Sequence, residues 1–260
     1  MLAARHEVKM TYIDLQKRLA ETIKRNHKFS STNIINNRID LESICVQEID
    51  FDAFVRNYAE RWSISSDDFY VFNTILPIEN TKILELGRMF GLSTAAFCCN
   101  HNIDITSIDD NSCDIHSFER LDFFNISEFL LNAEYKTKSI STITLKHSFI
   151  DKIAKQFLEQ YCVHYIDDKF SPKYLNQKYD FIFEDLVWNK DTMPILDSCI
   201  KYLDSYPDCV LIVHDDIRFP IVHERIKNFT YSYTSDYFTK EYNISPNLAL
   251  VSKRKLPFLP

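Results

Sequence analysis

Residues 82–94 read KILELGRMFGLST and carry the strongest indication of the fold of this chain. This stretch holds Gly87 and Gly91, both glycines of the 260-residue chain. A chain so poor in glycine makes its other turns from Asn, Asp, Ser and Pro, so we expect these two where no side chain fits. An apolar strand, a glycine turn and a helix starting at Ser93 and Thr94 form a cradle whose N–H groups face an anionic ligand. The stretch predicts a nucleotide-type cofactor site. A tight strand–turn–helix connection without a ligand is the alternative.

The composition is that of a folded, acidic protein. Hydrophobic residues make up 45% and aromatic residues 14% of the chain, which is enough for a full core in one large domain, with or without an appendage. The net charge is -7, and no basic cluster is longer than residues 253–255. Nucleic-acid binding needs a basic surface, so we expect a small-molecule partner and no nucleic acid.

Cysteine usage and hydropathy indicate the compartment. The seven cysteines are odd in number and include no C-x-x-C pair, so we interpret them as reduced thiols rather than as disulfides or a zinc site. Residues 1–19 lack an apolar signal core, and no run approaches the roughly 18 apolar residues of a membrane span. We expect a cytoplasmic protein without a membrane partner.

The N-terminal part has the spacing of helices. Apolar positions predict helices over residues 12–28 and 51–62, with a polar loop over residues 30–37. Ser and Asp at residues 65–68 are placed for an N-cap, so a further helix is expected over residues 67–76. We predict an N-terminal helical arm over residues 1–62, through which a homo-oligomer could form, and a main domain over residues 63–260.

The main domain alternates short apolar runs with helical patterns. Strands are predicted at residues 82–86, 103–108, 163–166, 179–183 and 209–213, and the helices between them include residues 148–161 and 192–203. Strands that are apolar throughout and separated by helices imply a parallel sheet covered on both faces. Residues 230–238 and 247–251, joined by a turn-rich piece without a helix, predict an antiparallel hairpin. The predicted class is a Rossmann-like, doubly wound α/β sheet with this C-terminal hairpin and the N-terminal arm.

One segment is longer than an ordinary connection. Residues 112–147 include the aromatic-rich stretch 118–135 and predict a structured insertion, which could serve as a lid.

Acidic residues end the predicted strands, where ligands of open α/β sheets bind. Asp109 ends the second strand, and its acceptor-only carboxylate suits the two hydroxyls of a ribose; Asp110 is the alternative. A solvated pair that caps the strand is the competing interpretation.

Asp185 and the pair Asp215-Asp216 end neighbouring strands. Three carboxylates without Cys or paired His suit Mg2+, Mn2+ or Ca2+ rather than zinc, although two adjacent Asp residues can equally form a solvated turn.

These motifs resemble those of class I S-adenosylmethionine-dependent methyltransferases. Residues 83–94 look like the E-x-G-x-x-x-G-x-S/T motif of the catechol O-methyltransferase-like enzymes, and residues 179–185 and 210–216 look like their strands ending in metal-binding Asp; macrocin-type sugar O-methyltransferases share this arrangement. The resemblance implies S-adenosylmethionine and a divalent cation, Mg2+, that holds the acceptor hydroxyl. It implies a metal set of Asp185, Asp215 and Asp216, and a cofactor-binding set of Glu85, Gly87, Gly91, Ser93, Asp109, Asp167 and Asp185.

The catalytic base is where the chain departs from this family. The lysine that catechol enzymes use falls on Trp188, so Lys190 and His214 are the catalytic candidates; a solvated loop charge and a strand-end core residue are their respective alternatives. The expected function is a metal-dependent O-methyltransferase acting on a small hydroxylated acceptor, such as a sugar or a secondary-metabolite precursor. A metal-independent N- or protein methyltransferase of the same fold and an inactive methyltransferase-like binding subunit remain as alternatives.

Overall fold

The computed structural model describes residues 9–26, 34–35, 38–40, 50–110, 115–117, 142–161, 163–186, 192–215, 219–227 and 229–260. Lys190, Asp216, Trp188 and the aromatic stretch 118–135 lie outside these ranges, so the interpretations that rest on them stay predictions.

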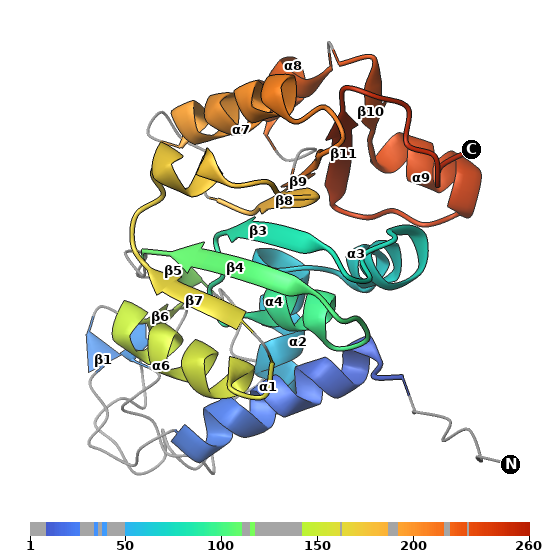
Figure 1. The fold of residues 1–260 in the computed structure, drawn as a ribbon. Helices are drawn as coiled ribbons and strands as arrows, with labels where there is room; N and C mark the ends of the chain where they lie inside the picture. Colours follow the sequence, from blue (N-terminus) through green and yellow to red (C-terminus); the bar gives the residue numbers. More distant parts are fainter. Residues whose placement is uncertain are drawn as a thin grey trace, which may run out of the picture.

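A seven-stranded sheet in the order β10-β11-β9-β8-β3-β4-β7 forms the centre of the molecule (Figure 1). Its five parallel strands match the predicted runs: β3 (Lys82–Leu86), β4 (Asp104–Asp109), β7 (Val163–Asp167), β8 (Phe181–Glu184) and β9 (Val210–His214). The C-terminal strands β10 (Tyr231–Tyr233) and β11 (Leu248–Ser252) join it antiparallel. The predicted Rossmann-like α/β class is confirmed.

Helices cover both faces of this sheet (Figure 1). One face packs against α1 (Tyr12–Asn26), α2 (Phe51–Trp62), α4 (Leu92–Cys98) and α6 (His147–Leu158). The other packs against α7 (Met193–Ser205) and α8 (Pro220–Ile226). Side chains along β3 alternate between these layers, since Ile83 joins the first core and Leu84 the second. Both faces of the central strands β3, β8 and β9 are buried, which explains why these strands are mainly apolar, whereas the edge strand β7 is partly exposed.

The N-terminal helices pack within the same core. Helix α1 contacts α2, α4 and α6, and its residues Leu15, Leu19 and Ile23 are fully buried. The apolar face of α1 is therefore covered within this chain, and a homo-oligomer formed through it stays a prediction.

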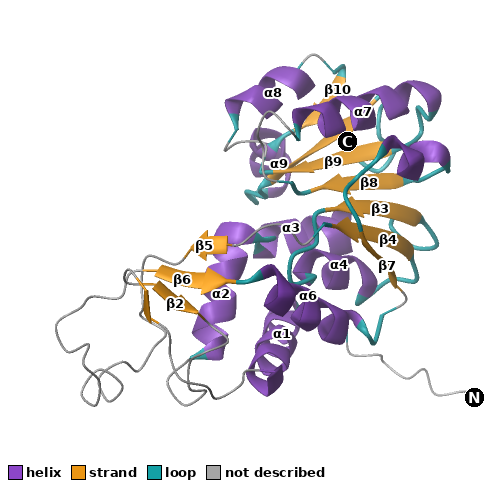
Figure 2. Ribbon diagram, turned by 90° about the vertical axis from the view of Figure 1, so that its left-hand side faces the viewer, coloured by secondary structure: helices purple, strands orange, loops and turns teal. Residues whose placement is uncertain are grey.

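A second, four-stranded sheet joins two distant parts of the sequence (Figure 2). Its order is β1-β2-β6-β5, where β1 (Ile34–Ile35) and β2 (Arg38–Asp40) precede the main domain and β5 (Ile115–Ser117) and β6 (Thr142–Leu145) belong to the predicted insertion. The predicted loop over residues 30–37 is wrong at residues 34–35, which form β1. Because β5 follows β4, and β6 leads into α6, this sheet is attached at the carboxyl edge of the main sheet.

Three local predictions need correction. The hairpin was expected to lack a helix, but α9 (Ser235–Tyr242) lies between β10 and β11, where the burial of Phe238 outweighs the strand-like aromatic spacing. The structure contains helix α8, which has a proline in its first turn and was not predicted from the sequence. The single helix expected over residues 67–76 is instead α3 (Ser66–Tyr70) followed by the π-helical turn η3 (Val71–Ile75). The 3-10 turn η4 (Pro172–Asn176) precedes β8.

The described residues contain no helix that is both long and apolar enough to cross a membrane.

Candidate functional site

Both glycines of the turn after β3 have left-handed backbone angles. Gly87 has φ +87°, and a Cβ there would lie 2.1 Å from the backbone oxygen of Asp185. Gly91 has φ +84°, and a Cβ there would lie 2.7 Å from Cδ1 of Leu158 on α6. The prediction that no side chain fits is confirmed, and the atoms that exclude a side chain belong to this chain. The cofactor-binding role of the two glycines stays a prediction.

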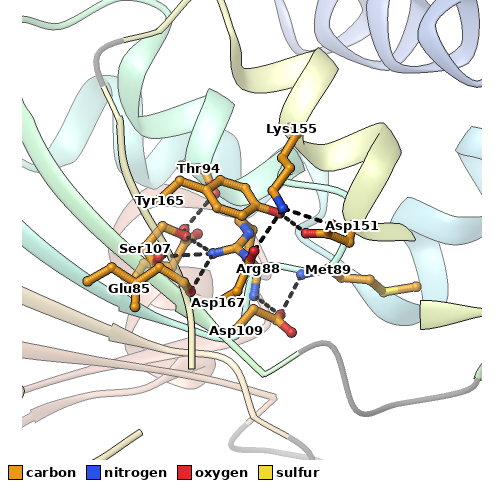
Figure 3. Close-up of polar contacts among 11 residues, drawn as sticks. Glu85, Arg88, Met89, Thr94, Ser107, Asp109, Asp151, Lys155, Tyr165 and Asp167 are labelled. Carbon is orange, nitrogen blue, oxygen red and sulfur yellow. Dashed lines mark hydrogen bonds and ion pairs between the residues drawn. The ribbon is translucent and has the colours of Figure 1, made fainter. Parts of the chain in front are cut away.

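Asp109, at the carboxyl end of β4, holds this turn in place (Figure 3). Its Oδ2 accepts hydrogen bonds from the backbone N–H groups of Arg88, at 2.7 Å, and Met89, at 2.9 Å. Met89 itself has φ +48°, which is uncommon for a residue with a side chain. A carboxylate offers about four acceptor positions, so binding the turn is compatible with binding the hydroxyls of a ribose.

Glu85 lies beneath the turn, fully buried between the sheet and α4. Its carboxylate accepts hydrogen bonds from Ser93 Oγ at 2.7 Å, Thr94 Oγ1 at 2.5 Å, and the hydroxyl of Ser107. Burial raises the pKa of Glu85, while these hydroxyl groups favour its charged form. Glu85 and Ser93, both predicted to bind cofactor, thus bind each other and join β3 to the first turn of α4.

Arg88 is a residue that the sequence interpretation missed (Figure 3). Its fully buried guanidinium donates from Nη1 to the carbonyl of Ser107 at 2.9 Å and from Nη2 to Asp167 Oδ1 at 3.1 Å. Its Cζ lies 3.4 Å from the centre of the Tyr165 ring. Lys155 Nζ donates to the other oxygen of Asp167 at 2.8 Å. The sequence did offer one indication of this site residue, because Arg88 is a charged residue between the two glycines.

The predicted metal-binding end of the sheet contains a second charged cluster. Asp185, His214 and Asp215 each offer a ligand atom, and these atoms lie within 4.8 Å of one another. Asp215 has φ +59°, its N–H donates to Asn247 O at 2.7 Å, and its carboxylate accepts a hydrogen bond from the Asn247 side chain. The structure therefore brings Asp185 and Asp215 together, as predicted, and adds an imidazole.

His214 lies between two carboxylates and is 1% exposed. Its Nδ1 is 2.9 Å from Asp185 Oδ1, and its Nε2 is 3.5 Å from Asp68 Oδ2. Burial lowers the pKa of His214, but the charges and hydrogen bonds of Asp185 and Asp68 outweigh burial and raise the pKa well above its ordinary value. The raised pKa favours the protonated imidazole, whereas a catalytic base needs the neutral form, and the catalytic role of His214 stays a prediction.

Asp68 connects this cluster to the N-terminal helices. The predicted cap is confirmed: Asp68 Oδ2 accepts from the N–H of Ser65 at 2.6 Å, and the Ser65 hydroxyl accepts from the Asp68 N–H at 3.2 Å. Asp68 Oδ1 also accepts from the N–H of Asn247 at 2.7 Å. One fully buried carboxylate thus fixes the start of α3, the approach to β11 and His214.

The donor atoms present fit a divalent cation. Two carboxylates suit Mg2+ or Mn2+, and the imidazole favours Mn2+ over Mg2+. A histidine ligand must be neutral, so His214 could bind a metal only after losing its proton.

Glu184, next to Asp185, is an exception to the rule that buried polar groups find partners. It is fully buried, and neither carboxylate oxygen has a hydrogen-bond partner among the described residues. Burial first, and then the charge of Asp185, raises the pKa of Glu184 well above its usual value, which favours the neutral acid form of its side chain.

Comparisons with known proteins give only distant similarity. No family model matches the chain, and no curated protein does. Similar solved structures include an O-methyltransferase from Bacillus cereus in complex with SAH, which is 16% identical over 77% of this chain and 88% of that one, with a TM-score of 0.43. The 23S rRNA methyltransferase ErmE is 11% identical over 74% of this chain and 69% of that one, with a TM-score of 0.36. YjhP from E. coli is 15% identical over 57% of this chain, with a TM-score of 0.34, and the match spans 48% of YjhP. Similarity at this level assigns the chain to no family.

The surroundings of the two glycines predict unequal costs of substitution. Gly87→Ala should destabilise the fold more than Gly91→Ala, because the first Cβ meets a backbone carbonyl and the second a movable leucine side chain. The left-handed backbone alone costs about 1–3 kcal/mol in each variant. Urea unfolding measures both. In a Leu158→Ala background, Gly91→Ala should lower the free energy of unfolding by less than it does in the wild type, whereas the effect of Gly87→Ala should not change. Equal losses of stability in the two glycine variants, with no effect of Leu158→Ala on either, would contradict this packing.

Proposed function

We propose that this chain is an S-adenosylmethionine-dependent methyltransferase. The observation that carries the proposal is Asp109: the glycine turn orients its carboxylate at the carboxyl end of β4, where ligands of open α/β sheets bind. The motif over residues 83–94, which resembles that of class I methyltransferases, supports it. Bound at this edge, the cofactor would supply a methyl group on a sulfonium.

This chain's residues divide the binding of such a cofactor among three strand ends, those of β4, β7 and β8. Asp109 would accept the ribose hydroxyls, and Asp167, its register partner on β7, would lie on the adenine side. Asp185, whose backbone packs against Gly87, would border the methyl end of the site. Glu85 and Ser93 would keep the turn and the start of α4 in place beneath the ligand.

We further propose that the acceptor is a hydroxyl group of a small molecule and that a divalent cation assists the transfer. Asp185 and Asp215, with the predicted ligand Asp216, would hold the cation, which would lower the pKa of the acceptor hydroxyl. His214 and Asp68 would orient the Asp185 carboxylate. Lys190 remains the predicted base. The acidic charge of the chain favours a small acceptor, such as a sugar, over a nucleic acid or a membrane, and we propose a cytoplasmic location.

One contact favours a second candidate, a metal-independent methyltransferase of the same fold. His214 Nδ1 lies 2.9 Å from an Asp185 oxygen that a cation would need. A protonated imidazole there supplies positive charge without a metal.

The cofactor proposal predicts the effect of removing the charge on Asp109. Asp109→Asn should weaken the binding of S-adenosylhomocysteine by about tenfold or more, since hydrogen bonds to charged groups contribute roughly 1.5–3 kcal/mol. The amide oxygen of Asn can still accept from the turn, so the fold should persist. Isothermal titration calorimetry measures the affinity. Asp110→Asn is the control and should bind as the wild type does; a larger loss in Asp110→Asn than in Asp109→Asn would move the ribose site to Asp110.

The metal proposal predicts binding of Mn2+ after dialysis against EDTA. Mn2+ should bind the wild type, and Asp185→Asn and Asp215→Asn should each weaken that binding by at least about tenfold, because each removes one charged ligand. Electron paramagnetic resonance of bound Mn2+ measures this directly. Asp168→Asn is the control, because that carboxylate bonds Lys173 and Tyr174 instead. Equal Mn2+ binding by all four proteins, or by none of them, would favour the metal-independent enzyme.

A further inference from the structure

We propose that the Arg88 side chain is a positioning residue for the adenine end of the cofactor site and acts through Asp167. The inference rests on the proposed function and goes beyond it, since the site prediction gives Arg88 no role. One residue would thus serve both carboxylates of the site: its backbone N–H holds Asp109, and its guanidinium holds Asp167 (Figure 3).

The guanidinium is fixed on several sides. Nη1 donates to the carbonyl of Ser107 on β4, Nη2 donates to Asp167 on β7, and the aromatic ring of Tyr165 stacks 3.4 Å from Cζ. The Tyr165 hydroxyl in turn donates to Asp151 on α6 at 2.8 Å. A planar, charged group held in this way has no alternative orientation, so the direction of its hydrogen bond to Asp167 is set.

Stability alone does not account for a buried arginine here. Moving a guanidinium out of water costs several kcal/mol, and a well-packed apolar side chain of similar volume is often as stable or more so. The side chain of Arg88 is 0% exposed, and its Nε has no hydrogen-bond partner within the described part of the chain. A charged side chain that is costly to bury and leaves a polar atom without a hydrogen bond is expected at a functional site.

Asp167 is the group that this arrangement orients. Arg88 holds its Oδ1 and Lys155 holds its Oδ2, yet 39% of its side chain is exposed at the carboxyl edge of the sheet. A carboxylate that two cations hold and that is partly exposed can accept N–H donors from a ligand, such as the exocyclic amino group of a purine.

The two carboxylates stand at the ends of adjacent strands. Asp109 and Asp167 are register partners on adjacent parallel strands, which lie roughly 4.8 Å apart. An acceptor-only group on each strand could take one of the two donor groups that adenosine carries at its opposite ends, the ribose diol and the amino group.

The test is a double-mutant cycle on the affinity for S-adenosylhomocysteine, measured by calorimetry. Arg88→Met keeps the backbone N–H to Asp109 and removes only the guanidinium; it should weaken binding by about tenfold, the effect of losing one charge-assisted contact. Arg88→Lys should restore part of the loss. Lys173→Met, the matched control, removes an exposed cation that pairs with Asp168 instead of Asp167 and should bind as the wild type does.

The cycle with Asp167→Asn separates positioning from a general loss of structure. If Arg88 acts through Asp167, Arg88→Met should weaken binding no further once Asp167→Asn is present. Independent, additive losses would overturn the proposal, as would a folded Arg88→Met protein that binds within twofold of the wild type. If Arg88→Met does not fold, the same cycle with Arg88→Lys decides by the same criterion. A wild type that does not bind S-adenosylhomocysteine would instead remove the proposed function, and this inference with it.

Discussion

The candidate site depends on the pair of hydrogen bonds from the turn after β3 to Asp109. The N–H groups of Arg88 and Met89 sit in a turn whose backbone turns left-handed at Gly87, Met89 and Gly91. Backbone N–H groups withdrawn from water need partners, and a single carboxylate on β4 supplies both. Because Asp109 fixes the turn, it also fixes where α4 begins and which way its first N–H groups point.

The turn is then enclosed by contacts that leave little freedom. Gly87 lets the end of β8 approach, and Gly91 lets α6 approach. Below the turn, Glu85 binds hydroxyl groups from α4 and β4. At the far side of the site, Asp68 and Asp185 hold His214 between α3 and β8. Buried charges of this kind add little net stability, but each sets the position of a strand end relative to its neighbour.

Much of the fold could be predicted because the pattern that defines it is local. Strands that are buried on both faces are apolar throughout, and the predicted helix over residues 51–62 coincides with α2. The second sheet could not be predicted, because β2 and β6 pair in parallel across a large sequence separation and carry no turn signal between them. In α9 the tertiary burial of Phe238 overrides a strand-like pattern.

In the candidate site, too, some features could be predicted from the sequence and others could not. Asp109, Asp185 and Asp215 follow parallel strands, and parallel topology brings the strand ends to one edge, so the meeting of Asp185 with Asp215 was predictable. The contacts of Arg88 and Asp68 were not, because no spacing rule says that a charged side chain turns into the core or which distant carboxylate meets His214. Sequence patterns thus locate the site, and the buried ion pairs that shape it become visible only in three dimensions.

A crystal structure with S-adenosylhomocysteine would show whether the Asp109-bound turn is a cofactor cradle. In that complex the ribose hydroxyls should lie on Asp109, with the two turn N–H bonds kept, and the adenine should lie beside Asp167 with its Arg88 contact intact. A ligand found away from the carboxyl ends of β3 and β4, or a ribose that does not contact Asp109, would contradict that role of the turn.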